Sequence, residues 1–292
     1  MAQRALHRYA TITAVATFFL LIAGGLVTST DSGLAVPDWP LSYGTWFPPM
    51  VGGIRYEHSH RMIAGVVGLM ILILAVWTAN VESRRWVRWL ASSALAGVVL
   101  QALLGGLTVL LLLPPAVSIA HACLGQTVFC VVVSLAYATS PGWSSCIRAG
   151  ETRERASVGR LSLIVAALAA LQLVLGAVIR HTGLAVLPHI LVASLLAFHA
   201  ILLAWRIIRA HGETAQILRG HAWRLIALVG TQLVLGVLVF THRADVLFRT
   251  AHVAVGALIL AQAVILAWEG VRQTPDLAPA VGVPTLSVEI PG

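Results

Sequence analysis

The chain has 292 residues, of which 59% are hydrophobic and only 10% are charged. Soluble domains carry about 25% charged residues, so this composition excludes a soluble domain and indicates a protein that crosses a membrane several times. All nineteen basic residues are Arg and they form no dense run, so the net charge of +8 does not predict nucleic-acid binding and is better explained by membrane topology.

Eight apolar stretches are long enough to cross the ~30 Å hydrocarbon core of a bilayer as helices. An even number of spans places both termini on one side. Fourteen Arg residues fall on that side and five on the other, so we predict that both termini are cytoplasmic. The first stretch follows Arg4 and Arg8 without a signal-peptide cleavage site after it, which predicts a retained helix. The predicted spans are 9–29, 60–80, 89–112, 117–138, 160–180, 186–206, 223–241 and 249–269.

The spans repeat as helical hairpins of about 65 residues, used four times. In three hairpins the first helix carries Gln and, four residues later, Gly; the first hairpin has Leu20 and Gly24 instead. The sequence therefore predicts an all-α membrane protein with eight transmembrane helices in two pseudo-symmetric four-helix bundles. The three complete motifs are Gln101–Gly105, Gln172–Gly176 and Gln232–Gly236.

The predicted organisation has two halves that differ in their loops. Residues 1–138 form the N-terminal half, 139–159 a polar cytoplasmic linker, 160–270 the C-terminal half, and 271–292 a Pro-rich tail that we expect to be disordered. The long outer loop at 30–59 has no counterpart in the second half, so it predicts a lid or docking surface over the first.

A histidine stands at the start of each second helix of a hairpin: His60, His121, His189 and His252. A lone His in a membrane helix more often makes a helix–helix hydrogen bond than binds a metal. Four in register favour haem ligation, because bis-His haem needs facing pairs from different helices at equal depth.

A small residue follows each of these histidines by four positions, which places it on the same face one turn deeper. It would leave room for a flat macrocycle, although ordinary small-residue packing of membrane helices explains it equally well. These residues are Ala64, Gly125, Ala193 and Gly256.

Other polar residues near the outer ends have candidate roles. Gln101, Gln172 and Gln232 would hydrogen-bond across helices or to a ring edge, and we favour the structural role. His181 and His242 follow the fifth and seventh spans. With the outer arginines they are candidate partners of haem propionates. These arginines are Arg61, Arg180, Arg243 and Arg249.

Glu57 is the carboxylate that makes the first hairpin different, because the other three His starts have none. It lies three residues before His60, hence one turn away on the same side if the helix starts early. We predict a catalytic role for Glu57. The alternatives are a solvated loop residue or a capping salt bridge to Arg61 at i+4.

The first outer loop contains Gly33-Leu34 and Pro37-Asp38-Trp39-Pro40, and Glu57, His60 and Arg61 open the second span. With the three later histidines and the doubled four-helix layout, these residues resemble the haem A synthase family over nearly the whole chain apart from the tail. The resemblance implies an oxygen-dependent membrane oxidoreductase of haem A biosynthesis for cytochrome oxidase. Such enzymes oxidise the C8 methyl of haem O stepwise to the formyl of haem A.

The resemblance also implies site roles. His60 and His121 would bind the substrate haem O, with Glu57 close to the reaction, and His189 and His252 would bind a haem b cofactor. Molecular oxygen or water would supply the oxygen atom. An electron donor that the residues do not identify, and haem O synthase, are candidate partners. The surroundings would be lipid of the bacterial cytoplasmic (inner) membrane, with no nucleic acid.

The chain departs from many relatives in lacking a cysteine pair in the first outer loop, where Val36 and Ser42 stand. A redox or loop-stapling role for such a pair cannot apply here. Two other functions remain open on the same four histidines: a bis-His di-haem b cytochrome that only transfers electrons, and a haem carrier that leaves its cargo unchanged.

Overall fold

The computed structural model describes residues 2–144, 153–210 and 213–272, and its regular elements are helices. Eight of the described helices are long and apolar enough to cross a membrane, which confirms the predicted spans. Part of the predicted linker and all but two residues of the predicted tail lie outside the described residues. The helices are α1 (Ala2–Ser29), α2 (Ile54–Val81), α3 (Arg85–Leu110), α4 (Pro115–Ala138), the single turn α5 (Pro141–Ser144), α6 (Arg153–Thr182), α7 (Val186–Arg209), α8 (Glu213–Thr241) and α9 (Val246–Arg272).

Most helices extend beyond their apolar stretches by one or two turns, because backbone hydrogen bonding does not end where the hydrocarbon ends. The extension of α2 matters most. It begins at Ile54 rather than at 60, so Glu57 lies within its first turn, one turn before His60. The predicted outer loop 30–59 is correspondingly shorter and comprises residues 30–53, called the lid loop below.

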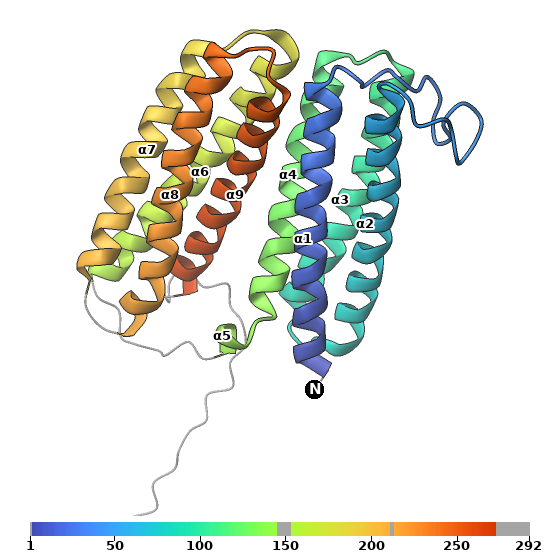
Figure 1. Cartoon of the computed structure of the whole chain (residues 1–292). Helices are drawn as coiled ribbons and strands as arrows, with labels where there is room; N and C mark the ends of the chain where they lie inside the picture. Colours follow the sequence, from blue (N-terminus) through green and yellow to red (C-terminus); the bar gives the residue numbers. More distant parts are fainter. Residues whose placement is uncertain (1, 145–152, 211–212, 273–292) are drawn as a thin grey trace, which may run out of the picture.

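The eight long helices form two groups of four (Figure 1). Within the first group α1 contacts α2, α2 contacts α3, α3 contacts α4, and α4 returns to α1. The second group repeats this ring with α6, α7, α8 and α9. In such a ring α2 lies diagonally opposite α4, and α7 opposite α9. These are the helices that begin with the four histidines.

The contacts between the groups are consistent with pseudo-symmetry. α1 contacts α9, α4 contacts α6, and α4 contacts α9. Exchanging each helix for its counterpart in the other group (α1 for α6, α4 for α9) converts the first contact into the second and leaves the third unchanged. A two-fold relation between the halves requires such a self-complementary set.

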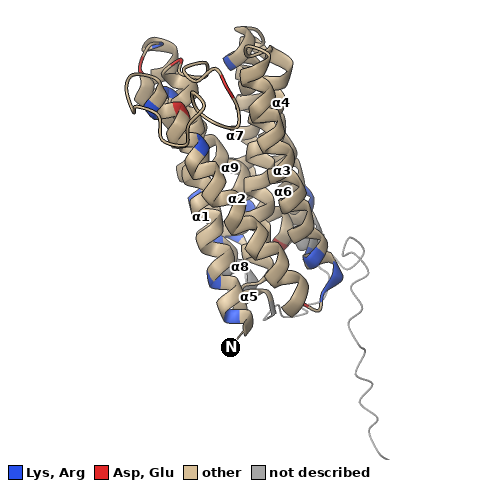
Figure 2. Cartoon of the chain, turned by 90° about the vertical axis from the view of Figure 1, so that its right-hand side faces the viewer, with Lys and Arg blue, Asp and Glu red and all other residues tan. Residues whose placement is uncertain are grey.

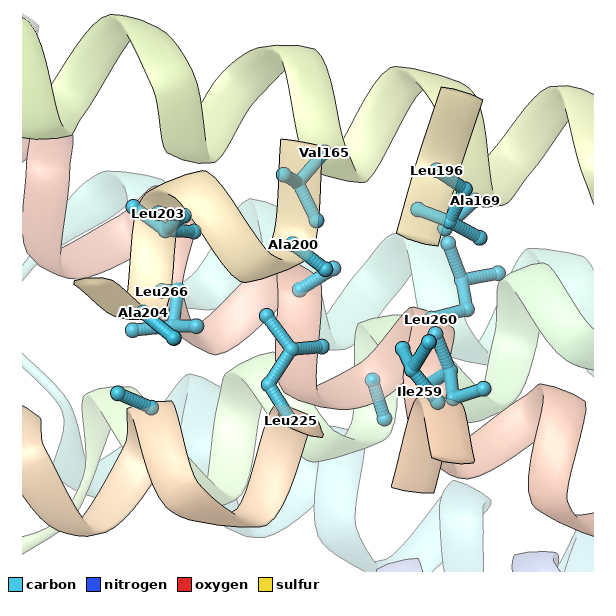
Figure 3. Close-up of a cluster of buried hydrophobic side chains, with 14 of the residues drawn as sticks. Val165, Ala169, Leu196, Ala200, Leu203, Ala204, Leu225, Ile259, Leu260 and Leu266 are labelled. Carbon is cyan, nitrogen blue, oxygen red and sulfur yellow. The ribbon is translucent and has the colours of Figure 1, made fainter. Parts of the chain in front are cut away.

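The fully buried apolar residues gather in the part of each group away from the histidines. Figure 3 shows the second cluster, where Val165, Leu203, Leu225 and Leu266 from four different helices meet. The first fully buried cluster residue after His60 on α2 is Val67, two turns deeper. Most of the helix length is free of charged residues (Figure 2). The apolar cores therefore end before the histidine end of the bundles, which is the end that carries the lid loop.

Candidate functional site

Each of the four register histidines packs against the repeat glycine of the preceding helix. A methyl group built on Gly24 would lie 3.1 Å from Cε1 of His60, and one on Gly105 would lie 3.2 Å from Cε1 of His121. The corresponding distances for Gly176 with His189 and Gly236 with His252 are 3.4 Å and 3.5 Å. Four hairpins therefore build the same local contact, called the glycine bed below, in which a glycine without a Cβ leaves room for the Cε1 atom of an imidazole.

The different distances in these four contacts predict different stability costs when each glycine is replaced by alanine. Gly24→Ala and Gly105→Ala bring the new methyl closer than ordinary van der Waals contact, so we expect each to destabilise the protein by about 1–3 kcal/mol. Gly176→Ala and Gly236→Ala are the matched controls, because their contacts are ordinary, and they should be close to neutral. Thermal unfolding in detergent would measure this. Equal shifts for all four variants would show that the imidazoles do not rest on the glycines.

In the second group, glutamine amides contact the imidazole nitrogens. Nε2 of Gln172 lies 3.0 Å from Nε2 of His189, and Nε2 of Gln232 lies 3.2 Å from Nε2 of His252. An amide NH₂ only donates, so with this amide orientation each histidine Nε2 accepts and is unprotonated. The Gln amides thus occupy the Nε2 lone pairs that a metal would take, and they would have to move away when a metal binds.

The first group is asymmetric at the same positions. Nε2 of Gln101 donates to the backbone carbonyl of His121 at 2.9 Å, and the position equivalent to Gln101 in α1 is Leu20. A methyl group on Gly125 would lie 2.8 Å from Nε2 of Gln101. The amide therefore occupies the space beside this glycine, as the alternative of ordinary small-residue packing predicts. Gly256 is similar, since its methyl would lie 3.3 Å from an amide nitrogen.

The residues fit an axially ligated macrocycle. The ring centroids of His189 and His252 lie 6.4 Å apart, close to the ~6 Å expected when two imidazoles bind one metal through bonds of about 2 Å. The Nδ1 atoms of all four register histidines are buried and have no hydrogen-bond partner among the described residues. Within those residues no three His, Cys, Asp or Glu side chains form a metal cluster, so pairs of histidines are the available ligands.

Glu57 and Arg61 form a buried clamp on the lid loop. Oε2 of Glu57 accepts the backbone N–H of Val36 at 2.8 Å, and its Oε1 lies 2.5 Å from Nη2 of Arg61. Nη1 of Arg61 also donates to the carbonyls of Asp38 and Leu41, at 2.7 and 2.8 Å. Both carboxylate oxygens are therefore engaged, and the i+4 salt bridge considered above as the alternative for Glu57 is present.

The lid loop has further internal ties. Asp38 accepts the backbone N–H groups of Tyr43 and Gly44, and these bonds, that of Gly44 foremost, lower the pKa of the Asp38 carboxyl. Ser42 hydrogen-bonds Nδ1 of His58 at 2.9 Å. Val36 and Ser42, which stand where many relatives have cysteines, are thus tied to Glu57 and His58, two consecutive residues of α2.

The candidate propionate partners do not lie together. Arg61 belongs to the clamp, and Arg243 is exposed beside Phe240. Arg180 and Arg249 converge on Asp31, with Nη2 atoms 4.0 and 3.9 Å from its Oδ1. Arg180 also donates to the carbonyl of Thr28. Arginines of the second group therefore reach the first group beside the lid loop.

Some contacts were not predicted from the sequence. The glycine beds had a signal in the sequence, because one glycine stands at the same place in every hairpin. The sequence did not show that this glycine contacts the next histidine, since that contact forms only when the helices pack. Trp39 packs on Gly106 of α3, where a methyl group would lie 2.8 Å from its Cδ2. This contact had no signal beyond the presence of both residues. It brings the lid loop next to the glycine bed of His121.

The fold and the histidine geometry define a class: an eight-span helical membrane protein with one diagonal histidine pair in each group of four helices. Residues 7–52 and 54–189 match the COX15-CtaA family model, described as cytochrome oxidase assembly protein. This match covers more than half of the chain, so the chain belongs to the COX15-CtaA family.

Curated relatives named haem A synthase are similar over part of the chain. That of Bacillus licheniformis is 38% identical over 109 residues, which is 37% of this chain and 36% of the relative. Those of Geobacillus thermodenitrificans and Bacillus pumilus are 39% and 40% identical over 110 and 108 residues. Those matches cover 37% and 36% of this chain, and 35% of each relative. The chain thus spans about a third of the length of the curated relatives that it matches.

Proposed function

We propose that this protein is a haem A synthase, a membrane oxidoreductase that converts the C8 methyl of haem O to the formyl of haem A. The observation that carries the proposal is the repeated His-on-Gly site beyond the apolar cores. Membership of a family of cytochrome oxidase assembly proteins supports it, as do relatives named haem A synthase.

In this proposal the two halves bind different haems. His60 and His121 bind the iron of the substrate haem O in the half 1–138, and His189 and His252 hold haem b in the half 160–270. The asymmetry supports this division, because the lid loop, Glu57 and Leu20 occur only in the first half, whereas both histidines of the second half have a Gln partner. Linker 139–159 joins the halves.

Each protein group then has a task. When bound, haem b would supply one-electron redox chemistry. Glu57 would hold or accept a proton close to the substrate methyl, and Arg61 would keep that carboxylate in place. Arg180, Arg249 and Arg243 are the candidate partners for propionates. If molecular oxygen provides the oxygen atom, an electron donor supplies two electrons that reduce the second oxygen atom to water. If water provides it, an electron acceptor must instead take two electrons for each oxidation.

The setting is the bacterial cytoplasmic (inner) membrane, with both termini cytoplasmic, as the Arg distribution favours. Haem O is poorly soluble in water, so haem O synthase in the same membrane is the partner we infer for delivery.

The proposal predicts a new pigment in cells that make haem O. Expression of the full chain in such cells should yield extracted haems whose masses correspond to hydroxylated and formylated haem O. Mass spectrometry of the extract measures this, and the His60→Ala variant is the control that keeps the second half intact. Unmodified haem O alone, from a protein present in the membrane at normal levels, would contradict the enzyme proposal.

A purely electron-transferring di-haem cytochrome is the rival reading, and one observation favours it. Both oxygens of Glu57 already have partners within the protein, the N–H of Val36 and the guanidinium of Arg61, which gives the carboxylate a structural role without any chemistry. The two functions differ in the first half: an electron carrier retains its haem there, whereas an enzyme exchanges it as substrate and product.

A further inference from the structure

The lid loop has an unusual polarity. Residues 39–54 contain no charged residue. Large apolar or aromatic side chains in this segment are exposed, with Phe47 at 84% and Trp46 at 64% of their full accessible surface. A loop surrounded by water normally shows the reverse pattern. The exposed set is Trp39, Tyr43, Trp46, Phe47, Met50 and Val51.

Polar side chains within and beside this segment have hydrogen-bond partners inside the protein. Ser42 is buried and bonded to His58. The Asp38 carboxylate accepts the N–H groups of Tyr43 and Gly44. The segment has therefore satisfied its polar side chains internally and left its apolar side chains outward, which is the arrangement of a surface that contacts an apolar or interfacial medium.

Two contacts fix the depth of the loop relative to the membrane. Trp39 lies against Gly106, which is one turn inside the end of spanning helix α3, and Gly33 lies against Leu113, just beyond that end. Figure 1 shows the loop projecting sideways beyond the end of α2 rather than rising above the bundle. The loop is thus level with the ends of the spans, where the headgroup layer lies.

The apolar surface continues from the loop onto the helices. The end of α3 and the turn after it expose Leu110, Leu111 and Leu112, next to the Leu113 that contacts Gly33. We propose that segment 39–51 lies in the headgroup layer of the bilayer and contacts phospholipid through Trp46, Phe47 and Met50. Aromatic side chains with an apolar body prefer this layer.

Contact with lipid gives the lid loop a second attachment. One part is held to α2 by the Glu57–Arg61 clamp, and the other rests in the bilayer beside the first group of helices. An amphiphilic ligand dissolved in the membrane would therefore pass this lipid-bound loop on its way to the histidine end of α1–α4. This inference depends on the spans and the loop only, so it can hold or fail independently of haem chemistry.

Spin labelling of the full chain in phosphatidylcholine nanodiscs tests the proposal. A nitroxide at Phe47→Cys should collide more often with oxygen, which partitions into lipid, than with a water-soluble nickel chelate. The matched control is Ala244→Cys, an exposed small residue in the short turn at the same end of the second group, which should show the reverse preference. The parent chain, treated identically, provides the background from native cysteines.

A label-free measurement complements it. Phospholipids brominated near the headgroup should quench a larger fraction of the tryptophan fluorescence of the parent than of Trp46→Phe. A Phe47 label as accessible to nickel as the Ala244 label would overturn the proposal. So would a label that neither reagent reaches, since the loop would then be covered by protein. Equal quenching of parent and variant would also overturn it.

Discussion

If haem b is bound as proposed, replacement of His189 or His252 by Ala is expected to abolish the low-spin haem absorbance of the purified protein. Loss of one of two axial ligands should weaken haem retention by more than the about 10–100-fold typical of outer-shell changes. The physical reason is that the two imidazole rings lie 6.4 Å apart on diagonal helices, and within the described residues no cluster of three His, Cys, Asp or Glu side chains offers replacement ligands. Absorbance spectra of the purified variants, with haem extracted and quantified, measure the effect.

His199→Ala is the matched control for this experiment. His199 belongs to α7 like His189, but its Nδ1 bonds the carbonyl of Leu195 one turn earlier and the residue is half-buried. Its replacement should leave the spectrum unchanged. If His189→Ala and His252→Ala both retain the parent spectrum, the resident haem does not belong to the second half, and the division of roles between the halves is wrong.

The sequence predicted the parts of this molecule that depend on local pattern. Eight apolar stretches suffice to give eight spans, because a helix in lipid must satisfy its backbone internally whatever its neighbours are. The register of His60, His121, His189 and His252 could also be predicted, since each follows a glycine at the same place in its hairpin. Pseudo-symmetric packing was expected from that repeat, and the described helix contacts are consistent with it.

Contacts between distant segments were the part that the pattern did not contain. Nothing local states that Gly24 faces His60 or that Val36 reaches Glu57, because both contacts arise when separate segments pack. Glu57 illustrates the consequence. Its position before His60 was correctly inferred, yet the sequence left open whether the carboxylate is free or paired with Arg61, and only the loop geometry shows that it is paired.

A double-mutant cycle on Glu57 and Arg61 is expected to separate chemistry from structure. Arg61→Gln leaves a buried carboxylate without its cation and should destabilise the protein by about 3–5 kcal/mol. Glu57→Gln keeps an acceptor for the N–H of Val36 and should cost less. In the double variant neither charge remains unpaired, so much of the lost stability should return. Thermal unfolding and hydrogen exchange at the Val36 amide, which Glu57 protects directly, report these changes.

If Glu57 handles a proton in the reaction, the activities of the variants in this cycle should not change in parallel with their stabilities. Glu57→Gln and the double variant should both oxidise haem O about 10²–10⁴-fold more slowly, the range of a general acid or base, although the double variant has regained much of the stability lost with the unpaired charge. Arg61→Gln should lose activity only as far as the loop is disordered. Recovery of activity together with Val36 protection in the double variant would mean that Glu57 acts solely as part of the clamp. The four histidines would then have to support the oxidation without that carboxylate.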